Sequence, residues 1–349
     1  MAAGHGFSRG VTLFPMTQTA HKFVMTGIDQ QPKNVIPRFT GKNVGKVIVE
    51  RFPQTEPQVT LEGNLNGHDV IFFFSYEGSI DERTNELRIA LDNAQQGGAD
   101  RITVIAPYTP YSRGDKRDQY HSSAAMRVFI RSCINLYNAC YITCDLHNAS
   151  TIELVDGPHR MLSLRKVMMA EAKRDMVVRV VATPDAGGTK RMRKWSETLY
   201  AKDEDDGKEH YLAKVVVDKM RAGNDSNAMA DECYGADVDG LDVLIVDDEA
   251  MTLGTLVSAA KVLKAAGARS IRALAYHGIL VGPAIERLAK SAVDELVVTN
   301  TVPVPDYKIE QANGKLRVVD VSGCLVEQAR KWHNYESLST MIDYAYDNK

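Results

Sequence analysis

The chain has 349 residues, of which 44% are hydrophobic and 25% charged, and this composition excludes wholesale disorder. The length predicts two domains of ~150 residues each. A net charge of −3 and a pI near 6.3 argue against a general nucleic-acid-binding surface, while local basic pockets for phosphate stay possible. The first residues have no apolar core of a signal peptide, and no stretch approaches the ~18 apolar residues of a membrane span. We therefore expect a cytoplasmic protein that binds neither nucleic acid nor membrane.

Short apolar runs alternate with amphipathic stretches along the chain. The runs are rich in Val and Ile and apolar throughout, a pattern typical of buried parallel strands, at 70–75, 101–108, 140–146, 177–185, 212–218, 242–248, 271–277 and 295–301. We expect helices at 83–97, 122–137, 160–174, 188–201, 253–266 and 282–290, and a C-terminal helix at 326–346. This alternation predicts an α/β fold with mostly parallel sheets flanked by helices.

Two segments share one plan. Residues 90–108 and 258–277 each contain an Ala-rich helix, a Gly-Ala stop, an Arg and then a β-run, and they lie about half the chain apart. Two copies of one α/β unit would explain this similarity. Chance is the competing explanation, because junctions of this kind are common. The five cysteines are scattered without a C-x-x-C pair, which favours reduced thiols over disulfides or a zinc site.

The segment VLIVDDEAMTLGT (243–255) is the most informative part of the chain. An apolar strand ends in Asp247 and Asp248, and a short loop with Thr252, Gly254 and Thr255 leads into a helix. In open parallel sheets, ligands bind outside the carboxyl ends of strands. Helix N-terminal amides with Thr hydroxyls suit an anion, and paired acids suit ribose hydroxyls or Mg²⁺. The alternative is a strand end with a capping Thr and solvated acids.

This segment resembles the phosphoribosyl-pyrophosphate loop V-D-D-x-x-D-T-G-G-T of phosphoribosyltransferases and ribose-phosphate pyrophosphokinases. Further segments resemble blocks of the second family, in that family's order over roughly residues 45–330. They are RFPQTE (51–56), PYTPYSRGDKRDQ (107–119), CDLHN (144–148), TPDAGGTKR (183–191), VVVDKMRAG (215–223), YHGILVGPAIERL (276–288) and VVTNTVPVPD (297–306). The chain is thus similar to ribose-phosphate pyrophosphokinases over nearly its full length, as a divergent member.

The resemblance implies an enzyme that moves the diphosphate of ATP to the C1 hydroxyl of ribose 5-phosphate with the help of Mg²⁺. It implies two phosphoribosyltransferase-like domains related by duplication. The first comprises 1–160, with 322–349 packing back on it, and carries the ATP loops; the second comprises 161–321 and carries the ribose-phosphate loop. The resemblance also implies a homo-oligomer built from dimers.

The site residues follow from the same resemblance. ATP would be bound by Phe52, Gln54, Glu56, Arg113 and Asp118. Asp247 and Asp248 would hold the ribose hydroxyls, and the 5-phosphate would be bound by Thr252, Gly254 and Thr255.

In this interpretation, four further residues would position the metal ion or stabilise the transition state. His147 and Asp185, each at the end of an apolar run, would position Mg²⁺. Lys219 and Arg221 stand two residues apart, so in an extended backbone they point the same way and could stabilise the transferring group. Without the resemblance, these would be a structural histidine and solvated charges.

The chain departs from the family pattern in four segments. Met251 replaces the Asp of D-T-G-G-T, and Leu253 replaces its first Gly. Gly114 stands where the ATP loop has Gln, Met220 is the middle residue of K-R-R, and 149–157 replaces the block after D-L-H. Leucine restricts a backbone that glycine leaves free.

The altered loop leaves three functions open. The acceptor is ribose 5-phosphate, or it is a larger ester such as ADP-ribose, whose inner phosphate is a diester with one charge. A regulatory homologue without catalysis is the third possibility. A phosphoribosyltransferase is disfavoured by the ATP loop at 107–119 and by the two-domain length.

Overall fold

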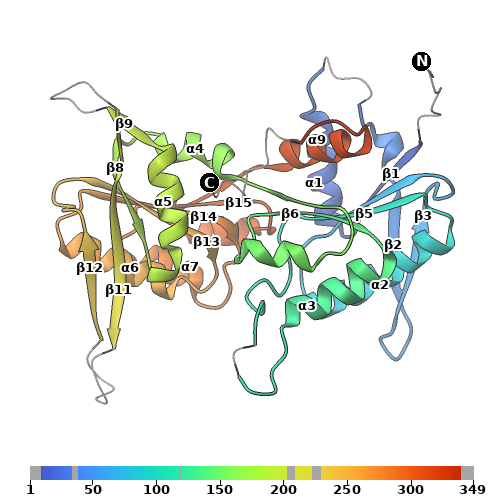
Figure 1. Ribbon diagram of the computed structural model, residues 1–349, viewed down its shortest axis with the longest axis horizontal. Helices are drawn as coiled ribbons and strands as arrows, with labels where there is room; N and C mark the ends of the chain where they lie inside the picture. Colours follow the sequence, from blue (N-terminus) through green and yellow to red (C-terminus); the bar gives the residue numbers. More distant parts are fainter. Residues whose placement is uncertain (1–8, 34–37, 118, 203–208, 222–228, 339–349) are drawn as a thin grey trace. The chain divides into compact units, whose positions relative to one another are not determined.

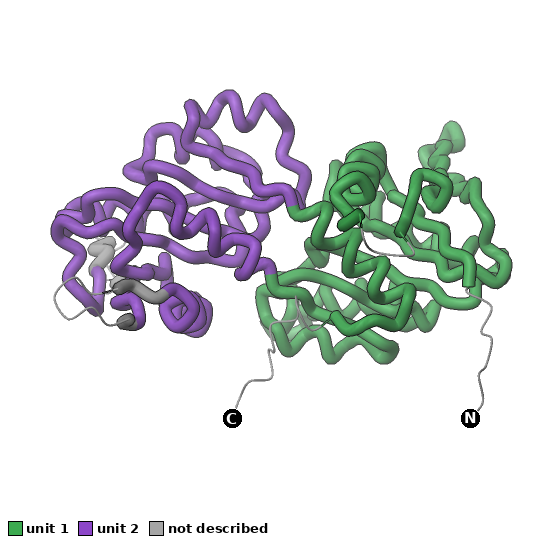
Figure 2. The backbone as a smooth tube through the Cα atoms, turned by 90° about the horizontal axis from the view of Figure 1, so that it is seen from above, with its two compact units in different colours: residues 1–163, 321–349 green, residues 164–320 purple. Residues whose placement is uncertain are grey.

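The computed structural model describes residues 9–33, 38–117, 119–202, 209–221 and 229–338. The chain divides into two compact units, residues 1–163 with 321–349, and residues 164–320 (Figure 2). Both units have a mostly parallel sheet between helices. In the described part of the chain, no helix has the length and apolarity needed to cross a membrane.

The first unit has a five-stranded parallel sheet in the order β1-β4-β5-β6-β7. Its strands are β1 (Val11–Pro15), β4 (Asp69–Phe73), β5 (Arg101–Ala106), β6 (Cys140–Cys144) and β7 (His159–Leu162). Helices α1 (Gln18–Asp29) and α9 (Ser322–His333) lie on one face, and α2 (Ile80–Gln96) and α3 (Ala125–Phe129) on the other (Figure 1). Strands β2 (Lys46–Arg51) and β3 (Pro57–Glu62) form an antiparallel hairpin.

The second unit has a seven-stranded sheet in the order β12-β11-β8-β13-β14-β15-β16, parallel except for β12. Its strands are β8 (Val178–Thr183), β11 (Ala213–Arg221), β12 (Met229–Gly235), β13 (Asp242–Ala250), β14 (Ser270–Gly278), β15 (Glu295–Thr299) and β16 (Leu316–Val319). A small hairpin joins β9 (Tyr200–Lys202) to β10 (Glu209–Tyr211). The helices are α4 (Arg165–Lys173), α5 (Thr189–Thr198), α6 (Gly254–Ala265), α7 (Ala284–Ala289) and α8 (Asp306–Gln311).

The two units repeat one topology. The order β1-β4-β5-β6-β7 in the first corresponds to β8-β13-β14-β15-β16 in the second, and a hairpin follows the first strand in both. The two segments with a common plan occupy the same place, since 90–108 spans α2 and β5 while 258–277 spans α6 and β14. In each, a helix joins neighbouring parallel strands.

All eight strands predicted from apolar runs are strands in the structure, and the helices predicted at 83–97, 188–201, 253–266 and 282–290 are α2, α5, α6 and α7. Three helix predictions need correction. Residues 160–162 belong to β7, so α4 begins only at Arg165. The helix predicted at 122–137 starts at Ala125 and continues as a π-turn and a 3-10 turn.

The C-terminal helix was predicted too far along the chain. Helix α9 spans Ser322–His333, and Tyr335 has a φ of 57°, which a right-handed helix does not allow. Residues 339–346 of the predicted helix lie outside the described residues.

Asp69, at the start of β4, is fully buried and links the first sheet to α9. It pairs with the Arg101 guanidinium, and His333 Nδ1 lies 2.9 Å from Asp69 Oδ2. Arg101 stacks over the rings of Trp332 and Tyr335, 5.5 and 4.9 Å from their centroids. Burial raises the pKa of Asp69, but hydrogen bonds and charges from His333 and Arg101 outweigh it and lower that pKa below its ordinary value.

Asp69→Asn should lower the free energy of unfolding by ~3 kcal/mol at pH 7, because it leaves a buried cation without its partner. A carboxyl with a lowered pKa adds stability that is complete above its unfolded-state pKa and is lost as the pH falls through its lower folded-state pKa, so the difference should shrink as the pH falls below about 4. Urea unfolding at pH 7 and pH 3 measures this. Exposed Asp100, which pairs with Arg9, provides the matched control Asp100→Asn. A difference that is equal at both pH values would contradict the assignment.

Candidate active site

Two carboxylates at the carboxyl end of β13 are held by one arginine from α5. Arg191 Nη1 lies 3.0 Å from Asp247 Oδ1, and its Nη2 lies 2.9 Å from Asp248 Oδ1. The Asp248 amide also donates to Asp247 Oδ1 at 2.8 Å. Burial raises the pKa of Asp247, and the neighbouring Asp248 carboxylate adds to this, while Arg191 opposes it. The guanidinium therefore keeps two crowded acids together in fixed positions.

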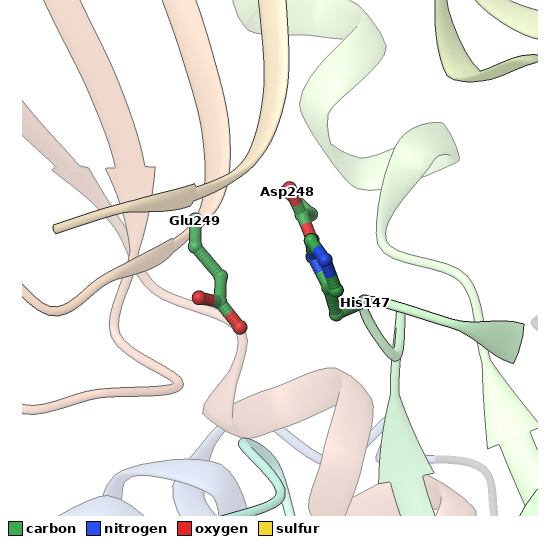
Figure 3. Close-up of side chains that lie close together, drawn as sticks. All are labelled: His147, Asp248 and Glu249. Atoms are coloured by element: carbon green, nitrogen blue, oxygen red, sulfur yellow. The ribbon is translucent and has the colours of Figure 1, made fainter. Parts of the chain in front are cut away.

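The next residue of β13, Glu249, is also buried. Asp248 and Glu249 are both 4% exposed, and a carboxylate oxygen of each lies within 4.8 Å of the other (Figure 3). Carboxylate oxygens are the ligands that Mg²⁺ prefers in proteins. The end of β13 therefore has a donor set that fits this ion.

The turn after β13 enters helix α6 through a strained residue. Leu253 has φ 59° and ψ 9°, the left-handed region that favours glycine. Its side chain is 4% exposed and packs in the apolar core of the second unit. The leucine therefore points away from the loop surface, where Thr252 is exposed and Thr255 half-buried. The family pattern has glycine at position 253, which this backbone favours, and the leucine side chain is instead accommodated by packing in the core.

Gly254 has a separate reason to be glycine. A Cβ at this position would lie 3.3 Å from Arg287 Nη1, so a side chain would crowd that guanidinium. Arg287, on α7, donates through Nη1 to the Thr252 carbonyl oxygen at 2.9 Å. The N-terminus of α6 therefore has a cation beside it, and both attract anions.

The metal-site residues proposed from sequence both follow strands. Asp185, after β8, is exposed and accepts from the Gly188 amide at 3.1 Å through Oδ1. It caps a 3-10 turn (Ala186–Gly188) that leads into α5 and so to Arg191. His147, in the first unit, follows β6 and is exposed.

Lys219 and Arg221 lie in the last part of β11. In the antiparallel pairing with β12, Lys219 is opposite Asp231 and Arg221 is opposite Met229. Residues 222–228, which follow in the chain, lie outside the described residues.

The residues proposed to bind the ATP base lie in the turn of the β2–β3 hairpin. Phe52 is 46% exposed, and Gln54 Nε2 donates to Glu56 Oε2 at 2.9 Å. Arg51, just before them, pairs with the buried Glu86 at 2.8 Å and so fixes the hairpin to α2. An exposed aromatic ring with neighbouring amide and carboxylate groups can bind a nucleobase.

Arg113 is exposed in the loop between β5 and α3, and Asp118 lies outside the described residues. Gly114 occupies a tight turn, since its amide donates to the Tyr111 carbonyl at 2.8 Å. A Cβ there would lie 3.2 Å from Ala125 Cβ and 3.4 Å from the Tyr111 oxygen. This departure from the family pattern therefore has a local packing reason.

Comparison with known proteins identifies the family. The chain matches the N-terminal domain of ribose phosphate pyrophosphokinase over residues 23–134 and the phosphoribosyl synthetase-associated domain over residues 232–343. It is 34% identical to a ribose-phosphate pyrophosphokinase of Haemophilus ducreyi, over 86% of this chain and 92% of that protein. It is 31% identical to ribose-phosphate pyrophosphokinase 2 of Schizosaccharomyces pombe, over 89% and 93%. The chain belongs to the ribose-phosphate pyrophosphokinase family.

The fold comparison agrees with this assignment. The structure of a phosphoribosylpyrophosphate synthetase from Mycobacterium smegmatis superposes with a TM-score of 0.78 at 24% identity, over 94% of this chain and all of that one. The α/β fold with two phosphoribosyltransferase-like units and the family resemblance are thus confirmed. The protein is an enzyme of the diphosphotransferase type.

Arg191, Glu249 and Arg287 were absent from the sequence-based site. Arg191 is the last residue of TPDAGGTKR and Arg287 lies in YHGILVGPAIERL, so both stood in segments that resemble the family. Their positions in these segments were the available signal. Glu249 likewise stands in VLIVDDEAMTLGT, directly after the two acids, at a variable position of the family pattern.

Proposed function

We propose that this protein transfers the β,γ-diphosphate of ATP to the C1 hydroxyl of ribose 5-phosphate, giving phosphoribosyl pyrophosphate and AMP. The sugar oxygen forms a bond to the β-phosphorus, and the bond from that phosphorus to the α-phosphate oxygen breaks. One observation supports this proposal most directly. Arg191 pairs with both Asp247 and Asp248, and these two acids stand just before the turn into α6. The curated relatives named above are ribose-phosphate pyrophosphokinases.

The acceptor would bind at the end of β13. Asp247 and Asp248 would accept hydrogen bonds from the ribose hydroxyls, with Arg191 holding both. The 5-phosphate would bind Thr252, Gly254 and Thr255 at the N-terminus of α6. No covalent intermediate is needed, because positioning and electrostatic stabilisation can account for the transfer.

The donor side would use other loops. Phe52, Gln54 and Glu56 would contact the base of ATP, and Arg113 and Asp118 would contact the rest of the nucleotide. Lys219 and Arg221 would stabilise the transferring group. Mg²⁺ would neutralise phosphate charge, held by Asp185 and His147 or by the carboxylates that end β13, of which the carboxylates are the better ligands.

A second acceptor is favoured by one observation. The turn that would bind the 5-phosphate has half-buried Met251 where the family pattern has an acid. Loss of that charge suits a diester such as the inner phosphate of ADP-ribose, which carries one charge. The product would then be ADP-ribose pyrophosphate, a compound suited to NAD synthesis. Leu253 gives this alternative less support, since its side chain is in the core.

A competition assay separates the acceptors. With ribose 5-phosphate and ADP-ribose at equal concentration, the unaltered enzyme should form AMP and mainly phosphoribosyl pyrophosphate. Met251→Asp with Leu253→Gly should raise the preference for ribose 5-phosphate further or leave it unchanged. If the enzyme instead prefers ADP-ribose, the double variant should shift preference towards the monoester by about tenfold, or ~1.4 kcal/mol.

Each outcome has a separate meaning. Clear preference for ADP-ribose would contradict the assignment of ribose 5-phosphate as the acceptor. Absence of AMP with either acceptor, although both bind, would favour the regulatory homologue. Because Leu253 is buried, the melting temperature of the double variant must be measured alongside, and Leu256→Ala, also in the core, is the matched packing control.

We also propose, from the resemblance alone, a cytoplasmic enzyme that forms homo-oligomers built from dimers. Its partners are ATP and a ribose 5-phosphate compound.

A further inference from the structure

A buried polar row crosses the carboxyl ends of β13, β14 and β15. The strand register pairs Glu249 with His277 and His277 with Thr299, so the three side chains lie on the same face of the sheet. They are 4%, 2% and 0% exposed. Burying ionisable groups is costly unless they are hydrogen-bonded. The row therefore needs partners, and Glu249 in it stands two residues before Met251, where the turn into α6 begins.

A chain of hydroxyl groups determines which histidine nitrogen carries a proton. Thr299 Oγ1 donates to the Tyr276 carbonyl at 2.6 Å, so its single proton is used. It must then accept from Thr301 Oγ1, 2.9 Å away. Thr301 in turn must accept from His277 Nδ1, also 2.9 Å away. Nδ1 is therefore protonated.

The ladder between β14 and β15 is irregular at this point. Its register shifts between Leu274 and His277, so backbone pairing alone does not fix the end of β14 against β15, whereas on the other side His277 and Gly278 pair with Glu249 and Ala250 of β13. The His277–Thr301 bond spans this irregular place. Just beyond it, the Leu280 amide donates to the Ala250 carbonyl at 2.8 Å, and the Val281 amide to the Met251 carbonyl at 3.0 Å.

Those two amides hold Ala250 and Met251, where the turn into α6 begins. The position of the turn therefore depends on where β14 ends, and the end of β14 is tied to β15 through His277. We propose that His277 is a positioning residue for the turn into α6, bridging the end of β14 to Thr301 through Nδ1. This inference rests on the proposed function, because it assigns the turn to acceptor binding.

Two substitutions separate the hydrogen bond from the ring. In His277→Asn, the amide nitrogen can replace Nδ1 as the donor to Thr301. In His277→Ala, Thr301 loses this donor. His277→Ala should raise the KM for ribose 5-phosphate roughly threefold to tenfold, the size of one lost hydrogen bond, and His277→Asn should raise it less, with kcat and the KM for ATP changed less than about twofold in both.

A third variant tests the bridge itself. Thr301→Val should raise the acceptor KM by a similar factor in the unaltered enzyme and add nothing in the His277→Ala background. The packing control is Leu296→Ala, in the core on β15. It should lower the melting temperature without changing the acceptor KM. The proposal is overturned if the control raises that KM as much as His277→Ala does, or if Thr301→Val acts equally with and without His277.

A second measurement does not depend on activity. Nitrogen-15 spectra of the histidine side chains should contain an Nδ1-protonated ring that disappears in His277→Asn and shifts in Thr301→Val. A ring protonated only at Nε2 would overturn the bridge. Failure of the proposed function is distinguished by calorimetric titration with ribose 5-phosphate. If the unaltered protein neither binds this compound nor releases AMP with it, the acceptor assignment is wrong and the role of His277 in acceptor binding is wrong with it.

Discussion

Replacing Lys219 or Arg221 by alanine is expected to lower turnover by roughly 10²–10³-fold, with little change in the KM for ATP. These cations are proposed to contact the transferring phosphoryl group mainly in the transition state, where one electrostatic contact contributes ~2.7–4 kcal/mol. An interaction made only in the transition state affects kcat and leaves ground-state binding unchanged. Steady-state AMP release at varied ATP concentration measures both quantities.

The strand that carries these residues also supplies the control. Lys214 is exposed near the start of β11, so Lys214→Ala removes a positive charge from the same strand at a distance from its last residues. It should leave turnover within about twofold, because an exposed charge distant from the reaction contributes little. Unchanged turnover in both Lys219→Ala and Arg221→Ala would remove the two cations from the mechanism. An equal loss in Lys214→Ala would point to a general effect of strand charge.

The strands could be predicted from sequence because their signal is local. Buried parallel strands are continuous apolar runs, and all eight such runs are strands. Short elements at sheet edges escaped prediction for the same reason. Strand β7 has only the four residues HRML, which read equally well as the start of a helix. The end of α9 at His333 depends on a left-handed backbone at Tyr335, and no local pattern predicted it.

The site was predictable where one segment contains both the chemistry and its position. Asp247, Asp248 and the turn after them are contiguous, so the pattern placed them together at a strand end. Contacts between distant segments were not predictable in this way. Arg191 precedes its two partners by more than fifty residues, and Arg287 follows Thr252 by 35. Tertiary folding brings these cations to the acids and the turn, and a single sequence carries no direct sign of it.

Arg191→Met is expected to lower kcat/KM for ribose 5-phosphate by about a hundredfold to a thousandfold. Methionine keeps much of the length and apolar contact of the arginine stem but removes both bonds to the carboxylates. Asp247 and Asp248 would then repel each other without a buried counter-charge, and an unpaired buried charge costs ~3–5 kcal/mol. The pKa of Asp247, already raised by burial and by Asp248, should rise further because Arg191 is the group that opposes this shift. The two acids would therefore lose their fixed position, and Asp247 would become a poorer acceptor for the ribose hydroxyls.

Arg193→Met is the matched control, because Arg193 lies on the same helix, is exposed, and pairs only loosely with Glu197 at 3.5 Å. It should change kcat/KM by less than about twofold. Arg191→Lys should fall between the two, since one ammonium group cannot contact both carboxylates with the paired geometry of a guanidinium. Melting temperatures of all three variants separate folding from catalysis. If Arg191→Met retains the kcat/KM of the Arg193→Met control, the aspartate pair does not depend on Arg191, and the two acids must be held for the acceptor by other groups.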